Sequence, residues 1–177
     1  MNAASARIEV IRADITTLEV DVIVNAANSR LVPGGGVDGA INDAAGPQLE
    51  KAMRAIGGCP TGEAVITPAF KLRAKHVIHT VAPVYAQHPE QEVWRLLGSC
   101  YRNTFALARE RKAHSIAFPS LGTGIYGIPI THACKVAVEV VEAHIATNAQ
   151  PHHIIFCCFS DKDAAVYRGA LSGDGGR

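Results

Sequence analysis

The sequence predicts a three-layer α/β/α sandwich with a mixed, largely parallel central sheet. Apolar runs of strand length alternate along the chain with segments of helical periodicity, which is the pattern of an α/β protein. Several runs are apolar throughout, as expected of strands covered on both faces. The 177 residues, 48% hydrophobic and 19% charged, suit one domain with a substantial core. We therefore expect a single domain over residues 1–177, with its core between about residues 7 and 170.

The expected strands are rich in valine and isoleucine. They span residues 6–13, 20–26, 63–69, 75–82, 114–120 and 153–160. Helical segments separate most of them, which favours parallel pairing through crossover connections. The exception is the short connection between residues 63–69 and 75–82, which indicates an antiparallel pair and therefore a mixed sheet.

The expected helices fill the intervals between the strands. They span residues 36–46, 47–57, 90–112, 129–147 and 161–172. Pro47 and Pro129 suit the first position of a helix, Gly57 suits a helix C-cap, and Ser160 suits an N-cap. The first five residues and the final SGDGGR are expected to be frayed tails.

Composition argues against several classes of protein. The formal charge is +1 with no basic cluster, so a nucleic-acid partner held through phosphates is not expected. No apolar run approaches the roughly 20 residues that span a bilayer, and the N-terminus lacks a secretory signal. The five cysteines are odd in number and lie mostly in apolar segments, which predicts reduced, buried thiols in a cytoplasmic protein.

The histidines predict no metal site. His76 and His79 form an H-x-x-H pattern, but on a strand their side chains point to opposite faces. The adjacent His152 and His153 have the same difficulty. We interpret these residues as ordinary structural histidines.

Two glycine-rich loops each follow a strand and precede a helix, where ligands bind in open α/β sheets. The first is NSRLVPGGGVD (28–38), and the second is SLGTGIYGIP (120–129). The second contains G-T-G-I-Y-G, but no acidic residue ends a strand about 20 residues later, as a dinucleotide-binding Rossmann unit requires. The Walker lysine is also absent. Bare backbone N–H groups at a helix N-terminus bind anions, so the pair of loops predicts a diphosphate site. The alternative is that the glycines only make tight turns.

Three polar residues lie beside these loops. Asn25 ends a buried strand, where an apolar residue would suit a purely structural role better. Asp38 falls in the first turn of the helix after Gly36. There its negative charge either only complements the helix dipole, or the carboxylate lies over the anion-binding loop and acts as a base. Asp14 ends the first strand, and its commoner use would be as the N-cap of a short turn at residues 15–17.

These residues and the motifs around them resemble the macrodomain family, in the branch that includes the MacroD-type hydrolases and the bacterial O-acetyl-ADP-ribose deacetylases. The resemblance covers about residues 7–170. It lies in ADIT (13–16), VDVIVNAAN (20–28), GGGVDGAINDAAG (34–46), PTGEAVIT (60–67), VIHTVAP (77–83) and FPSLGTGIYGIP (118–129).

The resemblance implies ADP-ribose as the ligand. Asp14 would accept a hydrogen bond from the adenine amino group beside the backbone of Ile15, and Phe159 would stack on the adenine. The diphosphate would lie on the second loop, at Ser120, Gly122, Thr123, Gly124, Ile125 and Tyr126, with Tyr126 also against the distal ribose. The first loop, at Gly34, Gly35, Gly36 and Val37, would close over that ribose and the adjoining phosphate.

The resemblance also implies hydrolysis of an ester on the distal ribose, in O-acetyl-ADP-ribose or in ADP-ribosylated proteins. Asn25 would orient the ribose hydroxyls and a water, and Asp38 would be the base, with no metal or cofactor. Its place at a helix N-terminus predicts that the pKa of Asp38 is lowered. The alternatives are a non-catalytic ADP-ribose reader and, more weakly supported, an RNA-related or regulatory binding module.

The chain departs from the family pattern at three positions. Ala13 and Pro33 stand where relatives usually have glycine, and Asn42 stands where many have histidine. Alanine costs little unless a positive φ is needed at position 13. Pro33 should stiffen the entry to the first loop, and Asn42 should slow turnover if that histidine tunes the ribose site.

Overall fold

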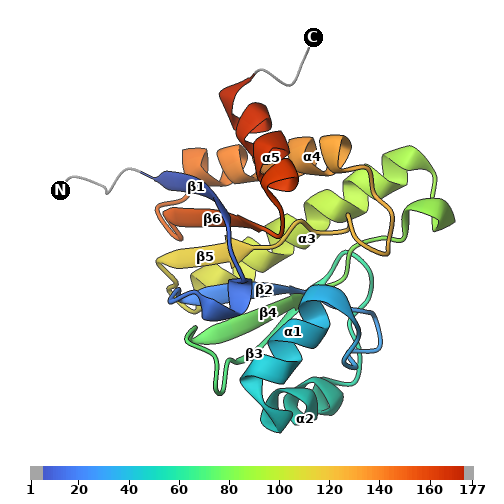
Figure 1. Ribbon diagram of the computed structural model, residues 1–177, viewed down its shortest axis with the longest axis vertical. Helices are drawn as coiled ribbons and strands as arrows, with labels where there is room; N and C mark the ends of the chain where they lie inside the picture. Colours follow the sequence, from blue (N-terminus) through green and yellow to red (C-terminus); the bar gives the residue numbers. More distant parts are fainter. Residues whose placement is uncertain (1–5, 174–177) are drawn as a thin grey trace.

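Six strands form one sheet in the order β1-β6-β5-β2-β4-β3 in the computed structural model, which describes residues 6–173 (Figure 1). The strands are β1 (Arg7–Arg12), β2 (Val22–Ala26), β3 (Ala64–Pro68), β4 (His76–Thr80), β5 (Ser115–Phe118) and β6 (His153–Cys158). All neighbouring pairs are parallel except β3 and β4, which are antiparallel. The predicted mixed, largely parallel sheet is confirmed. The tails at residues 1–5 and 174–177 lie outside the described residues.

The helices are α1 (Gly36–Ala45), α2 (Pro47–Ile56), α3 (Glu90–Glu110), α4 (Ile130–Thr147) and α5 (Asp161–Ser172), with short 3-10 turns at η1 (Ile15–Thr17) and η2 (Tyr85–Gln87). The predicted caps are largely correct. Pro47 begins α2, Gly57 ends it with φ 88°, and the Ser160 hydroxyl accepts a hydrogen bond from the Asp163 N–H. Pro129 is the N-cap of α4 rather than its first residue. The sequence therefore specifies these boundaries locally, to within about one residue.

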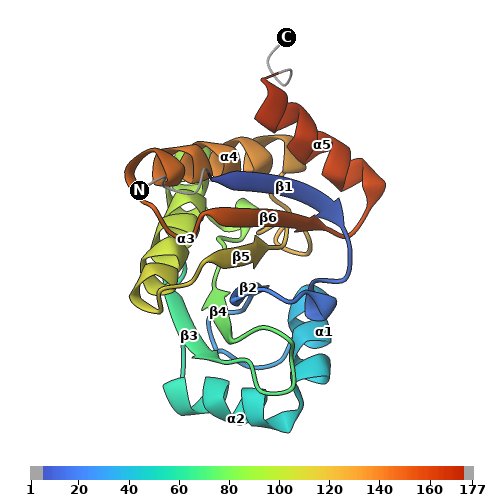
Figure 2. The ribbon, with the colours of Figure 1, turned by 90° about the vertical axis from the view of Figure 1, so that its left-hand side faces the viewer.

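The helices cover the two faces of the sheet. Val22 and Val24 of β2 pack with α3, α4 and α5 in one core, while Ile23 packs with α1 and α2 in the other. This alternation is the period-2 geometry of a strand, and residues 22–25 of β2 are buried on both faces. In Figure 2, α3 lies to the left of the strands and α1 to the right. The result is the predicted three-layer α/β/α sandwich.

The carboxyl ends of the parallel strands meet at one edge of the sheet. Because β1, β6, β5 and β2 are neighbours in that order, the segments that follow them lie in the same order along this edge. Those segments contain Asp14 after β1, Phe159 after β6 and Ser120 after β5, together with the first glycine-rich loop after β2. The topology thus brings together residues that are far apart in sequence.

Candidate functional site

A chain of buried polar side chains crosses from the sheet to α1. Asn25 on β2 donates through Nδ2 to Asp38 Oδ1 at 2.8 Å, and the same nitrogen lies 3.0 Å from His79 Nδ1. His79 Nε2 lies 2.9 Å from the hydroxyl oxygen of Thr67 on β3. All four residues are buried. The two predicted catalytic residues, Asn25 and Asp38, are therefore in direct contact.

The first loop and the start of α1 position the Asp38 carboxylate. Gly36 begins the helix with φ 58°, a conformation that favours glycine, and the helix then turns Asp38 inward over β2. Asp38 Oδ1 accepts from Asn25 and from Asn42 Nδ2 at 2.9 Å, and Asp38 Oδ2 accepts from the Gly34 N–H at 3.0 Å. Both lone pairs of Oδ1 are thus occupied, while Oδ2 has one hydrogen bond within the described residues.

The pKa of Asp38 is raised above its ordinary value of 3.8. Burial is the main cause, and it outweighs the hydrogen bonds from Asn25, Gly34 and Asn42, which act in the opposite direction. The prediction that a helix N-terminus would lower this pKa is wrong, because the sequence alone did not show how deeply the carboxyl group is buried. A raised pKa makes the carboxylate a stronger base than an exposed aspartate.

His79 is neutral at pH 7 because burial lowers its pKa from 6.5 to about 4. Asn25 Nδ2 can only donate, so Nδ1 of His79 accepts and the ring proton sits on Nε2, facing Thr67. The sequence interpretation of His79 as an ordinary structural histidine missed this contact. The signal was present in the pairing of two adjacent strands, since Asn25 and His79 are direct partners in the β2–β4 register.

The depressed pKa of His79 predicts an acid-labile fold. The unfolded chain takes up a proton on this ring below about pH 6.5, whereas the folded protein does so only near pH 4, so stability is complete above 6.5 and falls between 6.5 and 4. The difference corresponds to about 3 kcal/mol of unfolding free energy. Denaturant titrations from pH 4 to 7 should show a weaker pH dependence in His79→Asn than in the native protein, and an undiminished one in His114→Asn, where the histidine is exposed. An unchanged dependence in His79→Asn would contradict the assignment.

The second loop presents a run of backbone N–H groups. Within residues 6–173, the N–H groups of residues 122–126 donate to no backbone carbonyl or side chain. The loop is closed behind them by hydrogen bonds from the Gly127 N–H to Gly124 O and from the Ile128 N–H to Gly122 O, each 3.0 Å. Consecutive free N–H groups of this kind form an anion-binding concavity.

Position 122 of this loop requires glycine, whereas position 124 has space around it for a side chain. Gly122 has φ 80°, and a Cβ there would lie 2.4 Å from Ile128 Cδ1. Gly124 has nothing within 4 Å of the place of its Cβ. Gly122 is therefore needed for the shape of the loop, whereas Gly124 leaves bare backbone facing open space.

The remaining predicted residues of this loop differ in whether their side chains are bonded within the protein or exposed. Ser120 Oγ lies 2.9 Å from Tyr167 OH and accepts from Thr123 Oγ1, so its hydroxyl is engaged within the protein. Tyr126 is half-buried, and its carbonyl accepts from the Tyr85 N–H at 2.9 Å. Ile125 is 99% exposed, which leaves its apolar side chain available to cover a ligand.

The first loop offers further free N–H groups at the start of α1. The N-cap position, Gly35, provides no side chain to bond them. Among the described residues, the N–H groups of Gly35, Gly36 and Val37 donate to no acceptor. Gly34 is the exception, because its N–H is bonded to Asp38. Three of the four predicted positions in this loop thus present unpaired donors at a helix N-terminus.

The part of the carboxyl edge where β1 and β6 end carries an aspartate and an exposed aromatic ring. Asp14 Oδ1 accepts from the N–H and the hydroxyl of Thr16, so Asp14 does act as the N-cap of η1. Ile15 is buried beside it. Phe159, just after β6, is 93% exposed. Because β1 and β6 are neighbours, these residues share one end of the site.

The three positions that depart from the family pattern differ in whether they affect the backbone or contact the predicted site residues. Ala13 has no positive φ, so alanine introduces no backbone strain there. Pro33 is exposed. Asn42 contacts Asp38 directly, through its side-chain amide to both Oδ1 and the backbone carbonyl. Asn42 is therefore the departure that bears on the site.

No group of three or more His, Cys, Asp or Glu residues placed to hold a metal occurs among residues 6–173. The five cysteines are buried and unpaired, as predicted, and burial raises the pKa of Cys157 to about 11 and of Cys158 to about 12. Within the same range, no helix is both long and apolar enough to cross a bilayer.

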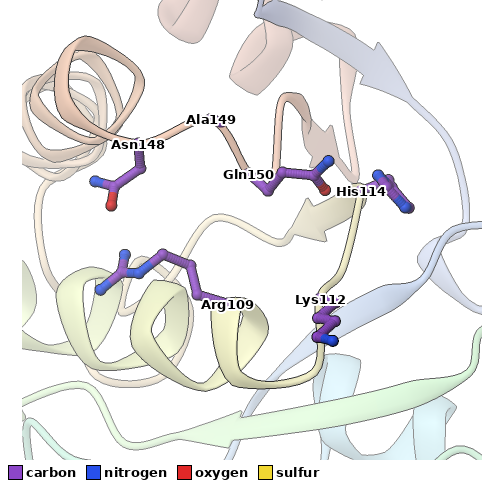
Figure 3. Close-up of a pocket in the computed structure, with 6 residues that line it drawn as sticks. All are labelled: Arg109, Lys112, His114, Asn148, Ala149 and Gln150. Atoms are coloured by element: carbon purple, nitrogen blue, oxygen red, sulfur yellow. The ribbon is translucent and has the colours of Figure 1, made fainter. Parts of the chain in front are cut away.

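A cavity of about 460 Å³ lies at the opposite edge of the sheet, beyond the carboxyl ends of α3 and α4 (Figure 3). It is lined by Arg109, Lys112, His114, Asn148, Ala149 and Gln150. None of the residues predicted from the sequence contributes to it. The predicted residues gather at the carboxyl edge instead.

Comparison with known proteins identifies the family of this chain. The family model "Macro domain" matches residues 24–137, more than half of the chain. The chain is 53% identical to the macro domain-containing protein CT2219 of Chlorobaculum tepidum, covering 93% of this chain and 95% of that protein. It is 49% identical to the O-acetyl-ADP-ribose deacetylase of Salmonella typhimurium, covering 97% of each. The Oceanobacillus iheyensis macrodomain with ADP superposes with a TM-score of 0.92 at 39% identity, covering 98% of this chain and 94% of that one. The chain therefore belongs to the macro domain family.

Proposed function

We propose that this protein binds ADP-ribose along the carboxyl edge of its sheet and hydrolyses an ester on the distal ribose, as in O-acetyl-ADP-ribose. The observation that carries the proposal is the contact between Asn25 and the buried Asp38 carboxylate, at 2.8 Å. A protein that only binds ADP-ribose needs free N–H groups but has no need of a buried carboxylate with a raised pKa. The names of relatives, among them the Salmonella O-acetyl-ADP-ribose deacetylase, support the same activity.

The order of groups along the edge matches the order of parts in ADP-ribose. Asp14, Ile15 and Phe159 would hold the adenine, and the free N–H groups of residues 122–126 would bind the diphosphate. The first loop, at residues 34–37, would close over the distal ribose next to Asn25 and Asp38. Tyr126 and the exposed Ile125 would cover the ligand from the second loop.

The reaction needs a general base that takes a proton from the attacking water. Asp38 Oδ2, which accepts one hydrogen bond within residues 6–173, would take a proton from water, whose oxygen attacks the acyl carbon of the ester. The tetrahedral intermediate then releases the ribose oxygen, which takes the proton that Asp38 had accepted, and the products are acetic acid, ionised to acetate at neutral pH, and ADP-ribose. Asn25, which donates to Asp38 Oδ1, would hold the base in place, so that orientation supplies much of the rate. The ester that links ADP-ribose to an acidic protein side chain has the same chemistry, which makes ADP-ribosylated proteins a second substrate class.

The direct test is to incubate the protein with O-acetyl-ADP-ribose, follow release of ADP-ribose by chromatography, and measure ADP-ribose affinity by calorimetry on the same sample. Turnover together with binding supports the hydrolase. Binding without turnover would make the protein an ADP-ribose reader, and no binding would overturn the whole assignment. An affinity that is insensitive to salt, with no retention of RNA, would dispose of the RNA-related module.

Asn42→Ala should shift the acid limb of the kcat profile to higher pH. Asp38 must be ionised to act as a base, so activity falls as the pH drops through its pKa. The Asn42 amide stabilises the ionised form, and its removal raises the pKa of Asp38 further. Profiles of kcat from pH 4 to 8 test this, with Gln48→Ala, an exposed amide on α2, as the matched control. A limb that stays in place or moves to lower pH would contradict the role assigned to Asn42.

A further inference from the structure

We propose that Gly39 of α1 is a positioning residue. Because it has no Cβ, the first loop can lie directly on α1, where the Gly34 N–H reaches the Asp38 carboxylate. This inference deepens the proposed function and rests on it for its catalytic consequence. Its structural part concerns one close backbone contact and one hydrogen bond, and both can be tested without any turnover.

The backbone of the first loop touches α1 at Gly39. A Cβ at position 39 would lie 2.7 Å from the Gly34 carbonyl oxygen. This is well inside the separation of about 3.5 Å at which non-bonded heavy atoms pack. The obstacle is backbone, so no side-chain rotation relieves it. Alanine at position 39 therefore requires the loop and the helix to move apart.

Residues 34 and 39 hold two places where helices often make a side-chain contact. Gly35 is the N-cap of α1, so Gly34 precedes the cap and Gly39 is the fourth residue of the helix. In many helices a pair of apolar side chains at these places fixes the entry of the chain. Here backbone rests on backbone instead, which brings the loop closer. Glycine is a poor helix former, so α1 itself gains nothing from glycine at position 39.

The close approach decides which N–H groups of the loop are bonded. The Gly34 N–H donates to Asp38 Oδ2 at 3.0 Å. The N–H groups of residues 35–37 have no acceptor among the described residues. The donor to the carboxylate is thus the residue before the cap, and the next three donors are left for a ligand.

The loop is fixed at its start and at its contact with α1, and its outer side is open. The Asn28 side chain exchanges hydrogen bonds with the backbone of Val32, at 2.7 and 3.3 Å, and fixes the start. Residues 33–36 are exposed. A Cβ at position 39 would therefore push the loop outward into solvent.

An outward shift of the loop would act on the proposed base. Asp38 Oδ2 would lose the one hydrogen bond that it accepts within residues 6–173. The Gly34 N–H stabilises the ionised carboxylate, so its loss raises the pKa of Asp38 further. The base would then be less well oriented, while the second loop, which we propose for the diphosphate, stays in place.

The first test makes the same substitution at two helical glycines. We expect Gly39→Ala to lower kcat for O-acetyl-ADP-ribose by about tenfold or more, with ADP-ribose affinity within about tenfold. The acid limb of its kcat profile should move to higher pH. Gly169→Ala on α5, where a Cβ meets nothing within 4 Å, should change neither kcat nor the limb. Thermal melts of both variants check the fold.

A second test asks whether the effect passes through the base. In a protein that already carries Asp38→Asn, Gly39→Ala should change kcat by less than about threefold. An independent structural defect would instead multiply the two losses. Gly34→Ala approaches the same contact from the loop, since its Cβ would lie 3.3 Å from Asp38 Oδ2. Gly34 is exposed, so this variant should fold, and it should also lower kcat.

Nuclear magnetic resonance tests the contact without turnover. In the native protein the amide ¹H shift of Gly34 should titrate together with the carboxyl ¹³C shift of Asp38, because the two groups are hydrogen-bonded. In Gly39→Ala the Gly34 amide should largely lose this titration, and the Asp38 carboxyl should titrate at higher pH. Gly169→Ala should behave like the native protein in both respects.

Three outcomes would overturn the proposal. These are native kcat with a native acid limb in Gly39→Ala, an equal loss of kcat from Gly39→Ala with and without Asp38→Asn, and a Gly34 amide that titrates in Gly39→Ala as it does in the native protein. If the native protein shows no turnover on any ester, the proposed function fails. The titrations of Gly34 and Asp38 still decide the positioning role in that case, so the two failures are distinguishable.

Discussion

Asp38→Ala should lower kcat for O-acetyl-ADP-ribose by about a hundredfold or more, the usual contribution of a general base. Its affinity for ADP-ribose should stay within about tenfold, or about 1.4 kcal/mol. The reason is that the groups proposed to bind the diphosphate differ from the group proposed to act as the base. The donors that we propose for the diphosphate are the backbone N–H groups of residues 122–126, whereas Asp38 contacts Asn25, Asn42 and the Gly34 N–H.

Alanine at position 38 also removes the carboxylate that accepts from the Asn25 and Asn42 amides, so a second variant is needed. Asp38→Asn keeps an oxygen for Asn25 and Asn42 but provides no base, and it should lose kcat to a similar extent. Asp43→Ala removes an exposed carboxylate from the same helix and should leave kcat unchanged. Calorimetry with ADP-ribose and a melting curve accompany each assay. A loss of affinity well beyond tenfold in a folded variant would make Asp38 a binding residue instead of the base.

Gly124→Val should abolish detectable ADP-ribose binding, a loss of about a hundredfold or more, without unfolding the protein. A Cβ at position 124 meets no atom within 4 Å, and its φ is not in the left-handed region, so the fold tolerates a side chain there. We expect the added atoms to occupy the space in front of the free N–H groups of residues 122–126. An anion that must approach bare backbone closely is then excluded.

The controls for Gly124→Val come from two other glycines. Gly169→Val on α5, where a Cβ also meets nothing within 4 Å, should keep both fold and affinity. Gly122→Ala should lower the melting temperature as well as affinity, because φ is 80° there and its Cβ would lie 2.4 Å from Ile128 Cδ1. Calorimetry and thermal melts of the three variants separate loss of binding from loss of structure. Native affinity in Gly124→Val would show that the diphosphate lies elsewhere.

Much of this arrangement could be predicted because its signals are local. The strand runs, the prolines at helix starts and the glycines with positive φ each depend on a few neighbouring residues, and the structure confirms most of them. The N-cap roles of Asp14 and Ser160 follow from the same kind of pattern. The placement of Asn25, Asp38 and the two loops at one edge needed only the rule that parallel strands end together.

The errors arose where a side chain's neighbours come from distant parts of the chain. The direction of the Asp38 pKa depends on how far α1 buries the carboxyl group, and burial outweighed the expected effect of the helix N-terminus. The contact of His79 with Asn25 depends on the register of β2 against β4.

The sequence by itself therefore determined the fold class, the order of the elements and the loops that present bare backbone, since periodicity and turn chemistry act over a few residues. Only the tertiary structure decided which polar groups meet in the buried row from Thr67 to Asp38, and with what protonation. Those properties depend on strand register and on desolvation, and both are created when distant segments pack together.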